Sequence, residues 1–386
     1  MTRLLIVTTV EATLRGFLAP YARHFRDLGW RVDGMAKGAS GSPECLAAFD
    51  ACYEAVWSRN PLNPWSALRM PGLLRRRVAA GAYDLVHVHT PVAAFLTRFA
   101  LRNLPGPGRP KVVYTAHGFH FEAHRKDLPN AVYAGLEKLA GAWTDRLVVI
   151  NRADEKEALR RGIVDRARLT YMPGIGLDLS YYDPARIPPG QVAGVRTELG
   201  LAPGQPLFLM VANFDPGKRH QDLLAAFEAL DAPDAHLALA GGGARAEGFR
   251  RWCRERGLDG RVHFLGYRRD IPALMRASLA MVHPSQREGL PRSVMEAMAL
   301  GVPVIGTDIR GTADLLALGG GLKVRVGDVA ALKAAMERLI RDPGHARTLG
   351  EEARPRMQDF DLPNLFRLHE ALYAEVLATR PPVQAA

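Results

Sequence analysis

Two glutamates mark the segment EGLPRSVMEAMALGVPVIGTD, residues 288–308, which is otherwise almost free of charge. Glu288 and Glu296 lie eight residues apart, and Arg292 is the one base between them. Ionised carboxylates accept hydrogen bonds, so two of them around one ligand could hold two sets of hydroxyl groups. A structural alternative is that Glu288 favours the dipole of a helix N-terminus and Glu296 is a solvated helix residue. The spacing alone leaves both interpretations open.

The sequence between the two glutamates predicts the start of a helix. A strand-like run ends near Ser285, QREG forms the turn, and Pro291 suits a first helical position, where no backbone donor is needed. Free amides at Gly289, Leu290 and the residues up to Ser293 would point out of this helix and could bind a phosphate or diphosphate. Glycine at position 289 lets a ligand approach the backbone closely.

Two series of strand-like runs position these residues. The first series covers residues 3–9, 84–90, 111–118 and 145–151, and the second covers residues 206–213, 235–243, 261–267, 279–285 and 302–308. Longer helix-like stretches separate the runs, which is typical of parallel sheets with crossover helices. We therefore predict the α/β fold class, with two doubly wound, Rossmann-like units whose ligands bind just after the strands.

The length of 386 residues favours two domains. We expect an N-terminal domain over residues 1–180, a linker rich in Pro, Gly and Tyr over 181–196, and a C-terminal domain over 197–362. Residues 363–386 contain helical apolar spacing, and we expect this last helix to cross back to the N-terminal domain.

Composition narrows the class of protein. The net charge of +11 and the pI of about 9.8 predict anionic partners. Because no nucleic-acid-binding module is recognisable, the phosphates of a nucleotide are a better explanation of this charge than a nucleic acid. The three cysteines form no CxxC pair, so we expect neither disulfides nor a zinc site, as suits a reducing cytoplasm. No apolar run approaches 18 residues, and the N-terminus is predicted to be mature protein, not a signal peptide.

Six motifs together carry a resemblance to a known family. The run EGLPRSVMEAMALGVPVIGTDIRGTADLL resembles the donor-site signature of retaining glycosyltransferases of family 4, which have the GT-B fold. The other landmarks, in the family's order, are HVHTP (87–91), YTAHGFHFE (114–122), MPGIGLD (172–178), NFDPGKRHQDLL (213–224) and RVHFLGYRRDIPALM (261–275). HGFHF and SRNPLNP (58–64) are similar to the branch that builds capsular, exopolysaccharide and lipid-linked glycans.

The resemblance implies two Rossmann-like domains facing a central cleft, with the acceptor on the N-terminal domain and the nucleotide sugar on the C-terminal domain. Glu288 would bind hydroxyls of the donor sugar, Glu296 would hold the ribose, and Lys218 would meet the diphosphate. Asn213 stands where many relatives have an arginine, so Arg219 or Arg292 could supply the second cation. Without the motif, Lys218 would be an ordinary surface lysine in a turn.

His117, in the AHG motif, would lie near the transferred sugar, and with Glu288 it forms the catalytic pair that the resemblance implies. The alternative is a structural histidine after a strand, and no proton transfer is assigned to it. Gly16, with Arg15 before it, would bring the first loop near the donor phosphates and acceptor. Tyr267 and Arg268 would flank the nucleotide base.

Two further features complete the site that the resemblance implies. Asp314 would support the site loop, and the glycines at 241–243 could form a phosphate or base loop or an ordinary turn. The sequence has no Asp-x-Asp pair placed to hold a metal on a nucleotide diphosphate, so we expect no metal and no other cofactor. Helix amides and Lys218 would stabilise the leaving diphosphate instead.

The segment WSALRMPGLLRRRVAA, residues 65–80, is a candidate for contact with a membrane. It carries Arg69, Arg75, Arg76 and Arg77 beside apolar residues. It could lie on an anionic membrane, where each base near the surface contributes about 1 kcal/mol. It could equally be an amphipathic helix packed on the first sheet with a solvated basic face.

The sequence therefore predicts a metal-independent, retaining glycosyltransferase that moves a sugar from a nucleotide diphosphate sugar, UDP-linked in our prediction. The acceptor would be a glycan or a polyprenyl-diphosphate-linked sugar, and the enzyme would be cytoplasmic or peripheral at the inner membrane face. One alternative is a nucleotide-sugar 2-epimerase of the same fold, which needs acid/base carboxylates but no acceptor. Another is a non-catalytic membrane-bound scaffold, which would bind no donor.

Overall fold

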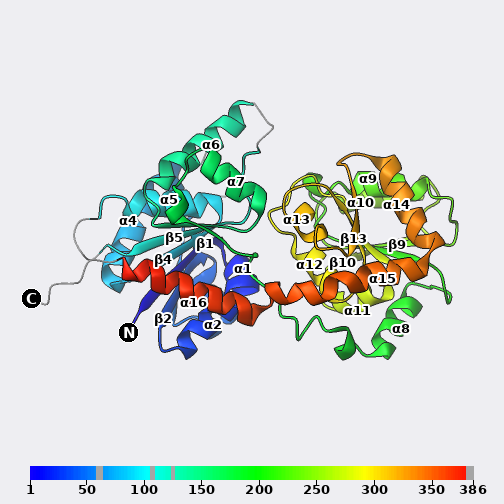
Figure 1. Cartoon of the computed structure of the whole chain (residues 1–386), viewed down its shortest axis with the longest axis horizontal. Helices are drawn as coiled ribbons and strands as arrows, with labels where there is room; N and C mark the ends of the chain where they lie inside the picture. The colour runs from blue at the N-terminus through cyan, green and yellow to red at the C-terminus, as the bar shows by residue number, and fades with distance from the viewer. Residues whose placement is uncertain (58–63, 105–108, 123–126, 380–386) are drawn as a thin grey trace, which may run out of the picture. The chain divides into compact units, whose positions relative to one another are not determined.

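The computed structural model describes residues 1–57, 64–104, 109–122 and 127–379. The chain divides into two compact units, Met1–Ile175 with Pro363–Ala386, and Gly176–Leu362. Each unit has a parallel sheet with helices packed against it (Figure 1). The SRNPLNP motif falls almost entirely on residues 58–63, outside the described part of the chain.

The first unit contains a seven-stranded parallel sheet in the order β3-β2-β1-β4-β5-β6-β7. Its strands are β1 Arg3–Val10, β2 Arg31–Lys37, β3 Ala51–Glu54, β4 Leu85–His89, β5 Lys111–Ala116, β6 Arg146–Val149 and β7 Leu169–Tyr171. Its helices are α1 Glu11–Thr13, α2 Ala19–Asp27, α3 Pro43–Ala48, α4 Pro64–Gly81, α5 Pro91–Leu101, α6 Leu128–Gly141, α7 Arg152–Arg160 and α16 Leu362–Ala378. Every residue of β4 and β6 is buried, as expected for parallel strands covered on both faces.

The second unit contains a six-stranded parallel sheet in the order β10-β9-β8-β11-β12-β13. Its strands are β8 Leu207–Val211, β9 His236–Ala240, β10 Val262–Gly266, β11 Ala280–His283, β12 Val304–Thr307 and β13 Gly321–Val324. Its helices are α8 Pro189–Glu198, α9 His220–Glu228, α10 Ala246–Arg254, α11 Ile271–Ala277, α12 Arg292–Ala299, α13 Thr312–Leu316, α14 Val329–Arg341 and α15 Pro343–Ala353. The predicted α/β fold with two doubly wound sheets is confirmed, and in both sheets the strand order reverses beside the first strand of the unit.

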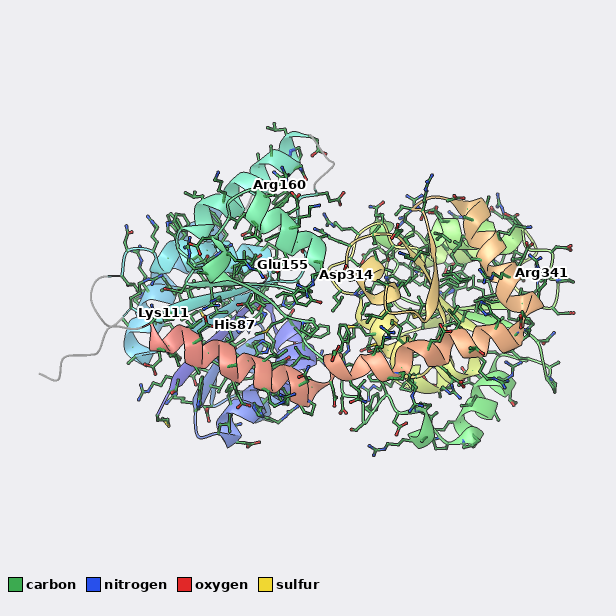
Figure 2. All side chains as sticks on the ribbon, viewed as in Figure 1. His87, Lys111, Glu155, Arg160, Asp314 and Arg341 are labelled. Atoms are coloured by element: carbon green, nitrogen blue, oxygen red, sulfur yellow. The ribbon has the colours of Figure 1, made fainter. Side chains whose placement is uncertain are left out.

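The segment 181–196, expected as a linker, is instead part of the second unit. It contains most of α8, and its Tyr182 and Val195 are buried in the apolar core of that unit. The proline and glycine content of this segment indicated a linker, so burial of Tyr182 and Val195 was not predicted from the sequence. The last helix, α16, contacts the first unit, because the Tyr373 hydroxyl lies 2.6 Å from His87 Nδ1 on the sheet (Figure 2).

Helix α4 decides between the two interpretations of residues 65–80. Its Met70, Leu74 and Val78 lie in the core of the first unit, so this apolar side packs on the protein and cannot insert into a membrane. Arg75 Nε donates to the Ala100 carbonyl at 2.6 Å, and the Arg77 guanidinium lies 3.7 Å from the centre of the Tyr53 ring. The packing is that of the amphipathic-helix alternative, with Arg69, Arg75 and Arg76 on the exposed face, and a contact of these bases with a membrane or an acceptor stays a prediction.

Candidate functional site

Most of the residues predicted to hold the donor gather at the carboxyl ends of β8, β11 and β12 in the second unit. Two hydrogen bonds join the loops there: Gln286 N donates to the Gly217 carbonyl at 2.9 Å, and Thr307 Oγ1 donates to the Ser285 carbonyl at 2.5 Å. Strands β8 and β11 are neighbours at the point where the strand order reverses, which is where ligands of such sheets bind.

Glu288 is the centre of a charged cluster. Lys218 Nζ donates to Glu288 Oε1 at 2.6 Å, and His283 Nε2 donates to the same oxygen at 2.9 Å. Arg310 Nε donates to the Glu288 backbone carbonyl at 3.2 Å. The Glu288 side chain is 12% exposed and that of Lys218 is 28% exposed, so the pair is shielded but within reach of a ligand.

This cluster keeps the Glu288 carboxylate ionised. Burial by itself would raise the pKa of Glu288, but the hydrogen bond from His283 and the charge of Lys218 outweigh burial and lower that pKa to about 2. An ionised carboxylate only accepts hydrogen bonds, so at neutral pH Glu288 is suited to bind hydroxyl groups.

Glu296 lies inside α12 and is only 7% exposed, so its interpretation as a solvated helix residue is wrong. The Tyr182 hydroxyl donates to Glu296 Oε1 at 2.6 Å, and Arg292 Nε donates to the same oxygen at 3.0 Å. Burial raises the pKa of Glu296, whereas the contacts with Tyr182 and Arg292 oppose that rise. A buried acid with two donors at one oxygen is fixed in position for a ligand.

The loop before α12 is shaped by a close backbone contact. Gly311 has a φ of 59°, and a Cβ at that position would lie 2.0 Å from the Gly289 carbonyl oxygen. Glycine at 311 is therefore needed for the loop after β12 to pack on Gly289 and Leu290. Helix α12 begins at Arg292, one residue later than predicted, so Pro291 is the residue before the helix and not its first residue.

The predicted second cation is already engaged. Arg219, whose φ of 54° places it in the left-handed region, pairs with Asp222 through two of its nitrogens. Asn213 is exposed at the edge of the same loop. The GGG segment packs on that loop, because a Cβ on Gly241 would lie 2.0 Å from the Ala212 carbonyl oxygen, which explains the glycine without a ligand.

The residues predicted to flank the base lie after β10. Tyr267 is 86% exposed, whereas Arg268 bridges Glu198 of α8 and Asp270 before α11. Arg268 therefore has a structural partner on each side, and its contact with a base stays a prediction. Asp314 lies in the first turn of α13 (Figure 2).

His117 belongs to a histidine cluster in the first unit. His117 Nε2 lies 2.9 Å from His89 Nδ1, and the ring of His89 lies 4.2 Å from that of His87. His87 Nε2 lies 2.7 Å from Thr115 Oγ1 on the neighbouring strand. Burial, with a smaller contribution from His369, lowers the pKa of His117 to about 4, so this imidazole is neutral at neutral pH and can act as a hydrogen-bonding group.

The first loop differs from the prediction. Strand β1 passes directly into α1, and Gly16 lies within the π-helical turn Leu14–Leu18 that follows. Arg15 Nε donates to Glu11 Oε2 at 3.3 Å. Gly16 is therefore a helical residue, not a residue of a strand-to-helix loop, and its proposed approach to the donor stays a prediction.

Within the described part of the chain, no group of three or more His, Cys, Asp or Glu side chains is arranged to hold a metal ion. Asp359 and Asp361 have Asp-x-Asp spacing, but Asp361 Oδ1 accepts hydrogen bonds from the backbone amides of Leu179 and Leu362 at 3.2 and 3.0 Å.

Two sequence families match the chain, one on each unit. The family described as Glycosyltransferase Family 4 matches residues 18–175, and the family described as Glycosyl transferases group 1 matches residues 195–356. EpsD of Bacillus subtilis, a protein named as a glycosyltransferase, is 31% identical over 91% of both chains. The chain belongs to glycosyltransferase family 4.

Other family members and a solved structure agree with this assignment. An α-1,3-galactosyltransferase of Escherichia coli, named for UDP-Gal and a GlcNAc-diphosphoundecaprenol acceptor, is 30% identical over 67% of both chains. The structure of Anabaena HepE in complex with UDP-glucose superposes with a TM-score of 0.79, covering 97% of this chain and all of HepE at 22% identity. That likeness concerns the fold: the two Rossmann-like units together give this glycosyltransferase the GT-B fold.

Two residues of the glycosyltransferase site were missed from the sequence. His283, the last residue of β11, is 2% exposed at its side chain and fixes Glu288. Its position at the end of a strand was a usable signal. Tyr182 holds Glu296 from 114 residues away, in a segment taken for a linker, and no local pattern indicated that contact.

Proposed function

We propose that this glycosyltransferase moves a sugar, with retention of the anomeric configuration, from a UDP-sugar to a glycan or lipid-linked acceptor. The observation that carries the proposal is the Glu288 carboxylate, ionised and held by Lys218 and His283, just before α12. The names of two similar proteins support the substrate classes, since one uses UDP-Gal and a diphosphoundecaprenol acceptor and the other was solved with UDP-glucose.

Each residue has a proposed role. Lys218 would leave Glu288 and bind the diphosphate, where a cation stabilises the negative charge of the leaving group without a metal. Glu288, released from Lys218, would accept hydrogen bonds from hydroxyls of the sugar, and Glu296 would accept those of the ribose. Gly289 and Leu290 would offer backbone amides to the phosphates, and the neutral His117 would hydrogen-bond a substrate hydroxyl.

The proposal is tested by offering the purified protein UDP-glucose, UDP-galactose or UDP-GlcNAc together with a polyprenyl-diphosphate-linked sugar and EDTA. We expect one donor to give a disaccharide product whose anomeric proton, measured by NMR, has the α configuration of the donor. Glu288→Gln is expected to abolish the product, because its amide cannot replace an acceptor of several hydroxyl hydrogen bonds.

Four outcomes would contradict the proposal in different ways. A β-linked product would exclude retention, and activity only after a divalent metal is added would exclude metal independence. A UDP-sugar epimerised at C2 in the absence of any acceptor would identify a 2-epimerase. Absence of both transfer and nucleotide binding would favour a non-catalytic scaffold. For the enzyme and for the scaffold alike, the location that we propose is the cytoplasmic face of the membrane.

A further inference from the structure

Helix α6, Leu128–Gly141, exposes an unusual amount of apolar surface. Leu128 is 76% exposed, Leu139 53%, Val132 50% and Leu136 39%. Their spacing of four, four and three residues places them within about 80° of arc on a helix with 100° per residue. We call these four residues the α6 stripe. Figure 1 shows α6 on the outside of the first unit.

The inner side of α6 holds this helix on the first unit. Asn130 bridges the backbone of Glu122 through two hydrogen bonds of 2.7 and 3.1 Å, and Ala134 and Ala140 are buried. Glu137 turns inward as well, and its carboxylate accepts hydrogen bonds from the Arg98 guanidinium at 2.9 Å and from the Tyr114 hydroxyl at 3.1 Å. The α6 stripe is therefore not needed to hold the helix on its unit.

The charges of α6 are sorted by side. The helix carries one acid and one base: Glu137 is buried against Arg98, with 12% of its side chain exposed, whereas Lys138 is exposed. The outer surface thus combines apolar side chains with a positive charge, in a protein of net charge +11. That combination is complementary to an anionic lipid surface.

Aromatic rings border the stripe. Tyr133, 41% exposed, lies beside the ring of His120 at 5.5 Å between centroids. Past the end of the helix, Trp143 packs at 5.8 Å from Phe99, and the Arg102 guanidinium lies 3.6 Å from the centre of the Phe99 ring. An exposed tyrosine on a helix with an apolar surface, as Tyr133 is on α6, is typical of segments that lie at a membrane–water interface.

We propose that the α6 stripe docks the enzyme on an anionic phospholipid membrane, with α6 lying in the plane of the interface. This inference rests on the proposed function in one respect, since a lipid-linked acceptor would be presented at such a surface. A helix of 14 residues is about 21 Å long, too short for a hydrocarbon core of about 30 Å. Among the described residues, no helix is long and apolar enough to cross a membrane.

The proposal is tested by flotation of the full chain, without nucleotide, on vesicles of phosphatidylethanolamine and phosphatidylglycerol. The wild type is expected to float, and the triple variant Leu128→Gln, Leu136→Gln, Leu139→Gln to partition roughly 10- to 100-fold less, because three exposed leucines that the membrane would bury become polar. Lys138→Glu is expected to weaken binding several-fold on these vesicles and to change nothing on phosphatidylcholine. Leu46→Gln, on α3 of the same unit and equally exposed at 53%, is the matched control and should float like the wild type.

Two results would overturn this inference. One is flotation of the triple variant equal to that of the wild type. The other is a wild type that does not float but sediments as a dimer that the triple variant dissociates, which would make the stripe a contact between copies of the chain. Hydrolysis of the donor in vesicle-free buffer separates the two proposals. The triple variant should hydrolyse the donor as fast as the wild type does. If the wild type hydrolysed no donor, that result would count against the proposed function alone.

Discussion

Replacement of Lys218 by alanine is expected to lower kcat/KM for sugar transfer by roughly 10²- to 10³-fold, the effect of removing one preorganised charge-stabilising group. Lys218 lies on the loop after β8 and reaches Glu288 Oε1 at 2.6 Å. In the proposed reaction the ammonium group instead meets the diphosphate, whose charge grows as the sugar leaves. The loss should therefore fall mainly on kcat, and affinity should fall more for UDP than for uridine, which has no phosphate.

The control for this variant is another lysine of the same unit. Lys333 lies on α14, forms an ion pair with Glu337 at 2.6 Å and is 32% exposed, close to the 28% of Lys218. Lys333→Ala removes a similar ion pair far from the strand ends, so its kcat/KM should equal that of the wild type. If steady-state kinetics gave the two variants the same rate, Lys218 would be an ordinary lysine in a turn.

Acidification is expected to destabilise the first unit strongly between pH 6.5 and about 4. Burial lowers the pKa of four histidines there, to about 4 for His117 and His369 and well below the usual value for His87 and His89. In the unfolded chain these imidazoles take up protons below pH 6.5, and in the folded unit they do not. The unfolded state then binds more protons, so stability falls as pH falls, by up to about 1.4 kcal/mol per histidine between pH 7.5 and 5.5.

Urea unfolding followed by tryptophan fluorescence measures this loss, because four of the five tryptophans belong to residues 1–175. The four histidines together set an upper limit of about 5.6 kcal/mol for the difference between the two pH values. His369→Leu should remove about a quarter of it, since His369 is one of the four buried histidines, and the bond from its ring to the Leu365 carbonyl at 2.8 Å lies within its own helix. Equal unfolding free energies at both pH values would show that the cluster is protonated or exposed in the folded unit.

The sequence was most informative where strands are buried on both faces. Such strands are continuous apolar runs, so β1, β4, β5 and β6 were recognised, and the site residues were then located just after strands of the second sheet. Strand β2, RVDGMAK, was missed because it contains a polar residue: Asp33 is buried there and accepts a hydrogen bond from the Tyr83 hydroxyl at 2.5 Å. Only the fold shows that partner.

Amphipathic helices were the least predictable elements, because a pattern does not say what its apolar side faces. Residues 65–80 have the composition of a membrane-surface helix, but Met70, Leu74 and Val78 pack on the sheet. Helix α6 has a less conspicuous sequence, yet it carries the exposed stripe. The difference lies in contacts with distant strands and helices, which sequence periodicity does not contain.

Long-range contacts likewise decide the donor site. Glu288 and Glu296 could be singled out by type and spacing, whereas the hydrogen bond from Tyr182 joins Glu296 to a segment 114 residues earlier. The local pattern also could not show that each candidate cation for the diphosphate pairs with a carboxylate: Arg219 with Asp222, Lys218 with Glu288 and Arg292 with Glu296.

Calorimetric titration of UDP into the wild type and into Glu296→Gln tests the central claim, that the second unit holds the nucleotide between α12 and the loop after β8. We expect UDP to bind the wild type and the variant to bind roughly 10- to 100-fold more weakly, as charge-assisted hydrogen bonds to the ribose are lost. Glu337→Gln, on α14 of the same unit, should bind like the wild type. Failure of UDP to bind the wild type, or equal affinity of Glu296→Gln and the wild type, would contradict the account.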